Sequence, residues 1–162
     1  MKLRLLIFFL FFIQQIAWGQ NPFQDSILSQ AERMYAYFFQ QDFKSFLNYT
    51  YPKVIELSGG REKLIRQMKK EIQDYQKSNI IYKKVVFREP SHIVKAGEEL
   101  HCLVPRESFF EMDGENHRLV SKMLAISQDS GKHWFFLEID RQDKTLIKKI
   151  LPHFNEDLLL HE

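Results

Sequence analysis

The stretch from Asp42 to Asn79 constrains the fold of this chain more than any other part of the sequence. It contains an apolar helical segment, a break at Pro52, a Gly59-Gly60 corner and a second, amphipathic segment. Proline disfavours helical geometry in the residue before it, and glycine commonly ends a helix, so these residues mark helix boundaries. The sequence after Asn79 has the pattern of antiparallel strands, which need a helical layer to cover one face.

Three helices are predicted before the strands. The first is expected to begin at Asn21-Pro22, an N-cap residue followed by proline at the first helical position. Asp42 is expected to cap the second helix, and the third runs from Arg61 to Asn79 with its charged residues in water. The apolar face of the first helix, at steps of three and four, consists of Phe23, Ile27, Ala31, Met34 and Phe38.

From Ile80 onward the apolar residues follow the period of strands. Asp113-Gly114 predicts a hairpin turn, and Asp129-Ser130-Gly131 predicts a second turn. Pro105 is expected to bulge or bend the long strand, because proline cannot donate to a sheet ladder. A helical turn or a short edge element is expected at 145–151. The predicted strands are 80–88, 92–95, 99–112, 117–127 and 133–139.

Residues 1–19 have the order of a secretory signal peptide. Lys2 and Arg4 precede the apolar run 5–13, and Ala17-Trp18-Gly19 places small residues where a signal peptidase reads. The run is too short to cross a bilayer comfortably, although an uncleaved anchor is an alternative. We therefore expect a periplasmic or secreted protein with one domain at 20–162 and no membrane contact after cleavage.

The charge of the chain argues against two classes of partner. Lys2 and Arg4 account for two of its 23 Lys and Arg residues, so the remaining 21 balance the 21 Asp and Glu residues. A neutral domain with interspersed charges gives no electrostatic basis for binding nucleic acid or an anionic membrane. Cys102, the single cysteine, excludes an intramolecular disulfide, and its strand position predicts a buried thiol.

The order of three helices and an antiparallel sheet, with Asp42-Phe43, Tyr49-Thr50-Tyr51-Pro52 and Gly59-Gly60 between the helices, resembles one known superfamily. It is similar to small exported bacterial members of the nuclear-transport-factor-two-like, or cystatin-like cone, superfamily. The segment 127–136, in which a Gly-Lys turn precedes a strand with tryptophan, also resembles their last hairpin.

That resemblance implies an α+β fold in which three N-terminal helices pack on a curved antiparallel sheet of about four to six strands. The sheet would wrap around the long helix and leave a cone-shaped pocket. Members of the superfamily include enzymes such as ketosteroid isomerase and scytalone dehydratase, and many non-catalytic binding or dimerising domains. Fold alone therefore does not choose between these functions.

Candidate catalytic residues are few. His101 would be an acid or base if its face of the strand lined the pocket, with Glu111 or Tyr75 in support. The alternative places His101 on the solvated outer face of the sheet. Asp113 and Asp129 fit turns better than catalysis. No histidine spacing indicates a metal site, and neither a metal nor a cofactor is expected.

The aromatic residues indicate where a pocket or an interface would lie. Adjacent phenylalanines at 109–110 and 135–136 place one ring on each face of a strand, so both faces need cover. Cover on the outer face favours a homodimer. The expected pocket or interface residues are Phe38, Phe46, Met68, Phe109, Phe110, Trp134 and Phe136.

These observations favour an exported, non-enzymatic domain that binds an apolar small molecule or a protein partner through a cone pocket or a sheet face. Two alternatives remain open. One is a lyase or isomerase that uses His101, and the other is a structural protein of envelope assembly whose outer sheet face pairs with another chain.

Overall fold

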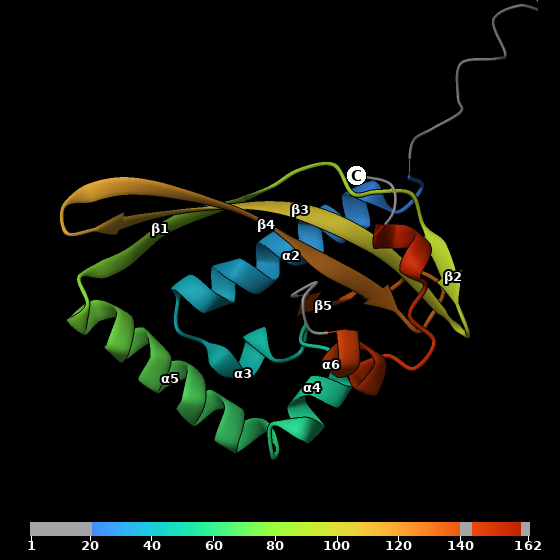
Figure 1. Cartoon of the computed structure of the whole chain (residues 1–162), viewed down its shortest axis with the longest axis horizontal. Coiled ribbons are helices and arrows are strands. Elements are labelled where there is room, and N and C mark those ends of the chain that lie inside the picture. The colour runs from blue at the N-terminus through green and yellow to red at the C-terminus, as the bar shows by residue number, and fades with distance from the viewer. Residues whose placement is uncertain (1–20, 140–143, 160–162) are drawn as a thin grey trace, which may run out of the picture.

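The structure is a computed structural model that describes residues 21–139 and 144–159. The predicted signal peptide at 1–19 lies outside the described residues. The fold is α+β, as predicted: N-terminal helices pack on an open, curved, five-stranded antiparallel sheet (Figure 1). Within the described ranges, no helix is long and apolar enough to cross a bilayer.

Four helices precede the sheet in the described residues, because the second predicted helix is divided at Pro52. Their bounds are α2 (Gln24–Phe39), α3 (Phe43–Phe46), α4 (Pro52–Leu57) and α5 (Arg61–Lys77).

The signals at the helix ends are largely confirmed. Asp42 caps α3, because its Oδ1 accepts a hydrogen bond of 3.2 Å from the Ser45 backbone N–H. Gly59 and Gly60 have φ angles of 86° and 96°, a left-handed geometry that suits glycine and turns the chain into α5. The predicted start of the first helix was wrong by a few residues. Asn21 Oδ1 accepts from the Phe23 N–H at 2.9 Å, which makes a turn before α2 begins.

The strands closely follow the predicted ranges. The Asp113-Gly114 turn between β3 and β4 is confirmed, with φ angles of 52° and 85°. The sheet order is β1-β3-β4-β5, and the short β2 pairs with β3. The strand bounds are β1 (Ile80–Phe87), β2 (Val94–Ala96), β3 (Glu99–Met112), β4 (Glu115–Ser127) and β5 (Phe135–Glu138).

The predicted bend at Pro105 is wrong. Pairing between β3 and β4 continues without a shift through Pro105 and Lys122, and the irregularity lies in β1 between Tyr82 and Lys84. The Pro105 carbonyl accepts from the Arg88 N–H at 2.9 Å, on the side where β1 has ended. A residue's N and C=O point to the same side of a strand, so the missing N–H costs no bond to β4.

Because the register is continuous, β3 presents alternate residues to two faces of the sheet. We call the face that carries Cys102, Val104 and Arg106 the inner face, and the face that carries His101 and Leu103 the outer face. Helix α2 packs on the inner face, as Figure 1 shows. The core there contains Ile27, Ala31, Met34, Cys102, Val104, Met123, Ala125, Trp134 and Phe136.

The outer face is covered by the chain itself at the end where β5 pairs with β4. The covering segment contains α6 (Lys144–Ile150), at the predicted position, and a 3₁₀ helix, η2 (Glu156–Leu159). Phe135 packs against the apolar cluster under this segment, so residues of the same chain cover its ring on the outer face. A homodimer stays a prediction. The buried members of the cluster are Tyr51, Leu103, Leu124, Ile126, Ile150, Leu151 and Leu158.

Candidate functional site

Three adjoining cavities lie between the helices and the inner face of the sheet. We call them the mouth, central and inner cavities, with volumes of about 590, 380 and 210 Å³. The mouth and central cavities share Phe38, Ile72, Tyr75 and Tyr82. The central and inner cavities share Tyr35, Phe46, Arg106 and Glu138. Because neighbours share walls, the three cavities form a row that extends from the β3–β4 turn past Arg106.

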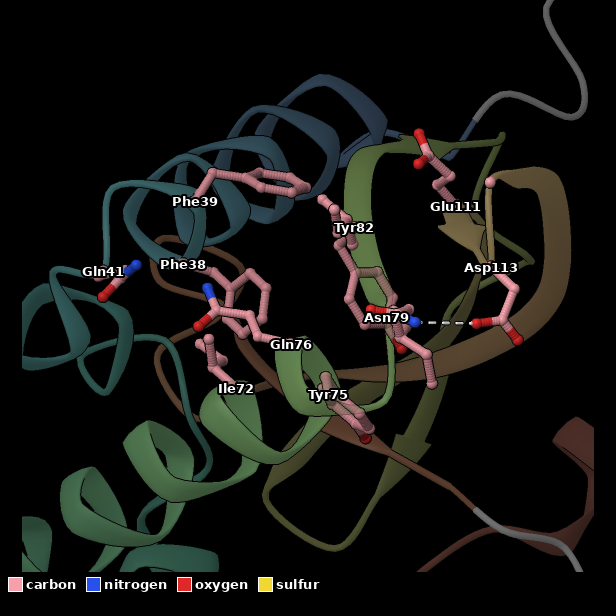
Figure 2. Close-up of a pocket in the computed structure, with 13 residues that line it drawn as sticks. Phe38, Phe39, Gln41, Ile72, Tyr75, Gln76, Asn79, Tyr82, Glu111 and Asp113 are labelled. Atoms are coloured by element: carbon pink, nitrogen blue, oxygen red, sulfur yellow. Dashed lines mark hydrogen bonds between the residues drawn. The ribbon is translucent and has the colours of Figure 1, made fainter.

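The mouth cavity combines aromatic walls with a polar rim. Figure 2 shows Phe38 and Phe39 on one side and Asp113 on the other, with Tyr82 and Asn79 between them. Asn79 Nδ2 donates to Asp113 Oδ1 at 3.1 Å, which ties the end of α5 to the β3–β4 turn. The rim therefore joins the helical layer to the hairpin.

Aromatic residues make up five of the twelve described wall residues of the central cavity. The Tyr82 ring lies 5.7 Å from Tyr75, 5.7 Å from Phe110 and 6.5 Å from Phe38, measured between ring centroids. Contacts between several rings hold each one in place, which gives a preformed apolar surface. Met68 completes the wall on α5.

Arg106 is the charged group at the junction of the central and inner cavities. It follows Cys102 and Val104 at strand spacing, so the guanidinium is on the inner face and its side chain is only 7% exposed. Its Nε donates to Ser121 Oγ at 3.1 Å, one Nη donates to the Tyr35 hydroxyl, and the other donates to Glu138. A buried guanidinium needs such partners, because a buried charge that loses its partner strongly destabilises the fold.

The partners of Arg106 differ in their surroundings. Burial raises the pKa of the Tyr35 hydroxyl to about 12, although the Arg106 charge opposes that rise, so Tyr35 stays protonated. The Glu138 side chain is 63% exposed. The pair therefore joins a fixed, buried cation to a carboxylate that has access to water.

Tyr75 lies in the walls of the mouth and central cavities. Its hydroxyl donates to Glu71 Oε1 at 2.7 Å, and this hydrogen bond is the largest cause of its raised pKa. A phenol whose proton is held by a carboxylate is a poor base near neutral pH.

His101 is placed neither in the cavities nor in solvent. It is completely buried on the outer face, where Phe154 stacks on its ring at 6.3 Å, and none of the three cavities has it in its described wall. Its Nε2 is 2.9 Å from Glu99 Oε2. Glu99 also accepts from the Tyr51 hydroxyl at 2.9 Å and from Gln128 at 2.6 Å.

The structure does not bring the three candidate catalytic residues together. Glu111 lies on the outer face, ten residues from His101 on β3, which is roughly 33 Å along an extended strand. It pairs with Lys83 at 2.9 Å, and it belongs with Tyr75 to the wall of the mouth cavity. The expected support of His101 by Glu111 or Tyr75 is therefore absent from the described residues.

The expected pocket residues divide into three groups. Phe38, Phe46 and Met68 line the central cavity, and Phe136 lines the inner cavity. Trp134 is completely buried in the core, and Phe110 packs on the inner face beside Tyr82 and His117. Phe109 is on the outer face, where the Lys84 ammonium lies 4.8 Å from its ring centroid.

The sequence marks Arg106 and Glu138 as polar residues on the strands and Tyr35 as part of the apolar helix face, but their mutual contact was not predicted. Arg106 has the same alternation as Cys102 and Val104, and that signal alone could have placed a charge on the core face. A bend at Pro105 would have changed the register, so the expected bend left the faces of the residues beyond it unassigned. Nothing local to Tyr35, which is far from Arg106 in sequence, indicated the contact.

Comparison with known proteins adds no assignment: no family model, no curated protein and no solved structure gives a significant match to this chain. Across residues 21–139 and 144–159, no group of three or more His, Cys, Asp or Glu side chains is placed to hold a metal ion.

Proposed function

We propose that this chain is an exported binding domain of the nuclear-transport-factor-two-like kind, and that it holds an apolar small molecule in its row of cavities. The observation that carries the proposal is the central cavity of about 380 Å³, whose wall combines aromatic and aliphatic side chains with a few polar groups. Sites for small molecules typically have this size and this composition.

A binding role fits the contacts better than an enzyme based on His101. His101 is buried against Glu99 on the face opposite the cavities, and Tyr75 hydrogen-bonds Glu71. His101 therefore cannot transfer a proton in the central cavity, and the raised pKa of Tyr75 makes that residue a poor base there.

The test is binding of the neutral fluorescent probe N-phenyl-1-naphthylamine, together with native mass spectrometry of the gently purified mature chain. Ile72 lies in the walls of the mouth and central cavities, so Ile72→Trp should fill this space and abolish probe binding. Gln73→Trp, at the next and exposed position of α5, is the matched control and should bind as the wild type does. Equal binding by all three proteins would refute the proposal.

A protein partner on the sheet is the second candidate, and the envelope-assembly alternative rests on the same surface. Ile81 and Val120 are exposed on the outer face of the hairpin end. A dimer through this face would shift to monomer in sedimentation experiments when Val120 is replaced by Lys. A wild-type protein that sediments as a monomer at high concentration would exclude this dimer.

A further inference from the structure

In the ion pair between Arg106 and Glu138 the cation is buried and the carboxylate is exposed, which suggests that another carboxylate can take the place of Glu138. Arg106 cannot reach water without breaking the inner face, because Ser121 and Tyr35 also hold its guanidinium. Glu138 is the last residue of β5, and most of its side chain is in water. The Glu138 carboxylate can return to water at little cost, but the buried guanidinium then needs another anion in its place.

The inner cavity also contains a polar group that, unlike Arg106 and Glu138, lacks a hydrogen-bond partner among the described residues. Thr50 lies in its wall, and the buried Thr50 hydroxyl oxygen has no hydrogen-bond partner among the described residues. Arg106 and Glu138 belong to the same wall. The inner cavity therefore shares the Arg106–Glu138 pair with the central cavity and adds a buried hydroxyl that can still form a hydrogen bond.

We propose that the ligand is an elongated amphiphile with a carboxylate, which replaces Glu138 on Arg106 while the apolar chain extends through the central cavity toward the mouth. This inference rests on the proposed function, because it names the chemical class of ligand for the same cavities. Its distinguishing claim is that Glu138 competes with the ligand for one guanidinium.

The geometry suits such an exchange. Ser121 holds Nε and Tyr35 holds one Nη, so the guanidinium stays oriented when Glu138 leaves, and the other Nη can donate a charge-assisted hydrogen bond to the ligand carboxylate. Thr50 would then gain an acceptor for its hydroxyl. The chain of the ligand would pack on Phe38 and Tyr82 and leave water, which supplies the favourable free energy of binding.

The remaining charge in the central cavity belongs to Glu71, which is exposed and accepts a hydrogen bond from Tyr75. Together with Glu138 it would favour an organic cation held against the aromatic walls. The buried position of Arg106 favours the anion instead, because a cationic ligand would lie close to an immovable positive charge.

The experiment measures displacement of N-phenyl-1-naphthylamine by dodecanoate, by dodecan-1-ol and by dodecyltrimethylammonium, all below the concentrations at which they form micelles. The wild type should bind dodecanoate about tenfold more tightly than the alcohol, since a charged hydrogen bond is added. Glu138→Gln should tighten dodecanoate binding a further roughly fivefold or more, because the ligand no longer competes with the Glu138 carboxylate for the buried guanidinium, and it should leave the alcohol unchanged.

Two further variants complete the design. Arg106→Gln should abolish the preference for dodecanoate over the alcohol, and if this variant fails to fold, Glu138→Gln decides the question alone. Glu115→Gln removes the same charge from an exposed position of β4 outside the three cavities and should change nothing.

Each contrary result has a separate meaning. Equal binding of dodecanoate and the alcohol, or weaker dodecanoate binding by Glu138→Gln, overturns the carboxylate inference and leaves the proposed binding function standing. A preference for dodecyltrimethylammonium overturns the inference in favour of a cation. Failure of the wild type to bind the fluorescent probe overturns the inference and the proposed function together.

Discussion

His101 and Glu99 form a buried contact in which only one imidazole nitrogen is satisfied. The His101 Nε2 lies 2.9 Å from Glu99 Oε2, whereas Nδ1 is buried without a hydrogen-bond partner among the described residues. In the neutral tautomer that donates from Nε2, Nδ1 carries only a lone pair. Protonation would create a buried N–H without an acceptor. Accordingly, burial lowers the pKa of His101, although Glu99 opposes this shift.

The stability of the protein should therefore fall as the pH falls below the ordinary histidine pKa of 6.5. The unfolded chain binds a proton there that the folded chain does not bind, so the free energy of unfolding decreases until the folded pKa is passed. Urea unfolding at about pH 7.5, 6.5 and 5.5 measures this slope. The groups around His101 are Glu99, with Tyr51 and Gln128 bound to it, and the ring of Phe154.

Two controls isolate the contribution of His101. His101→Gln should lose this part of the slope, and His117→Gln, on the inner face, should keep it. Burial would raise the pKa of Glu99, but hydrogen bonds from Gln128, His101 and Tyr51 outweigh it and lower the pKa. The stability that Glu99 contributes through its lowered pKa is lost only below the ordinary glutamate pKa of 4.5, which is outside the pH range of the measurement. A His101→Gln slope equal to that of the wild type would contradict the prediction.

The sequence predicted local structure better than the surroundings of single side chains. The alternation of apolar residues along the strands and the Asp113-Gly114 turn were sufficient to predict the positions of β3 and β4, because these signals depend on nearby residues. His101 was placed on the face opposite Cys102, but its cover comes from the distant segment 144–159. Neither a solvated nor a cavity-lining His101 was therefore found. Long-range packing of this kind leaves little trace in a local pattern.

Gly131 should be essential for packing, whereas Gly114 should be replaceable. Both have left-handed φ angles, 88° and 85°, so alanine at either position costs about 1–2 kcal/mol in backbone strain. A Cβ at Gly131 would also overlap the ring of Phe23, which packs on Trp134, whereas a Cβ at Gly114 meets nothing within 4 Å. Overpacking adds about 1–3 kcal/mol. Thermal unfolding should place Gly131→Ala well below Gly114→Ala, and equal losses would refute the clash.

Cys102 should be inert in the folded protein. It is completely buried in the α2 core, and burial raises the pKa of its thiol to about 12. Because the thiolate is the reactive form, Ellman's reagent should react about a hundredfold more slowly with native protein than with protein in urea. Ser29→Cys in a Cys102→Ala background, at an exposed position of α2, should react rapidly without denaturant. Rapid labelling of native Cys102 would show that the core around α2 opens.

The segment 144–159 should stabilise the fold without contributing to the cavities, because it covers the opposite face of the sheet. Leu151 is 1% exposed in the outer-face cluster, so Leu151→Ala should lower the free energy of unfolding by about 2–5 kcal/mol. Lys148→Ala breaks only an exposed pair with Glu156 and should cost less than about 1 kcal/mol. Urea unfolding gives both values. At urea concentrations too low to unfold it, Leu151→Ala should still bind N-phenyl-1-naphthylamine as the wild type does. Loss of probe binding by folded Leu151→Ala would mean that the outer cover and the cavities are coupled through the sheet, and binding could then no longer be assigned to the inner face alone.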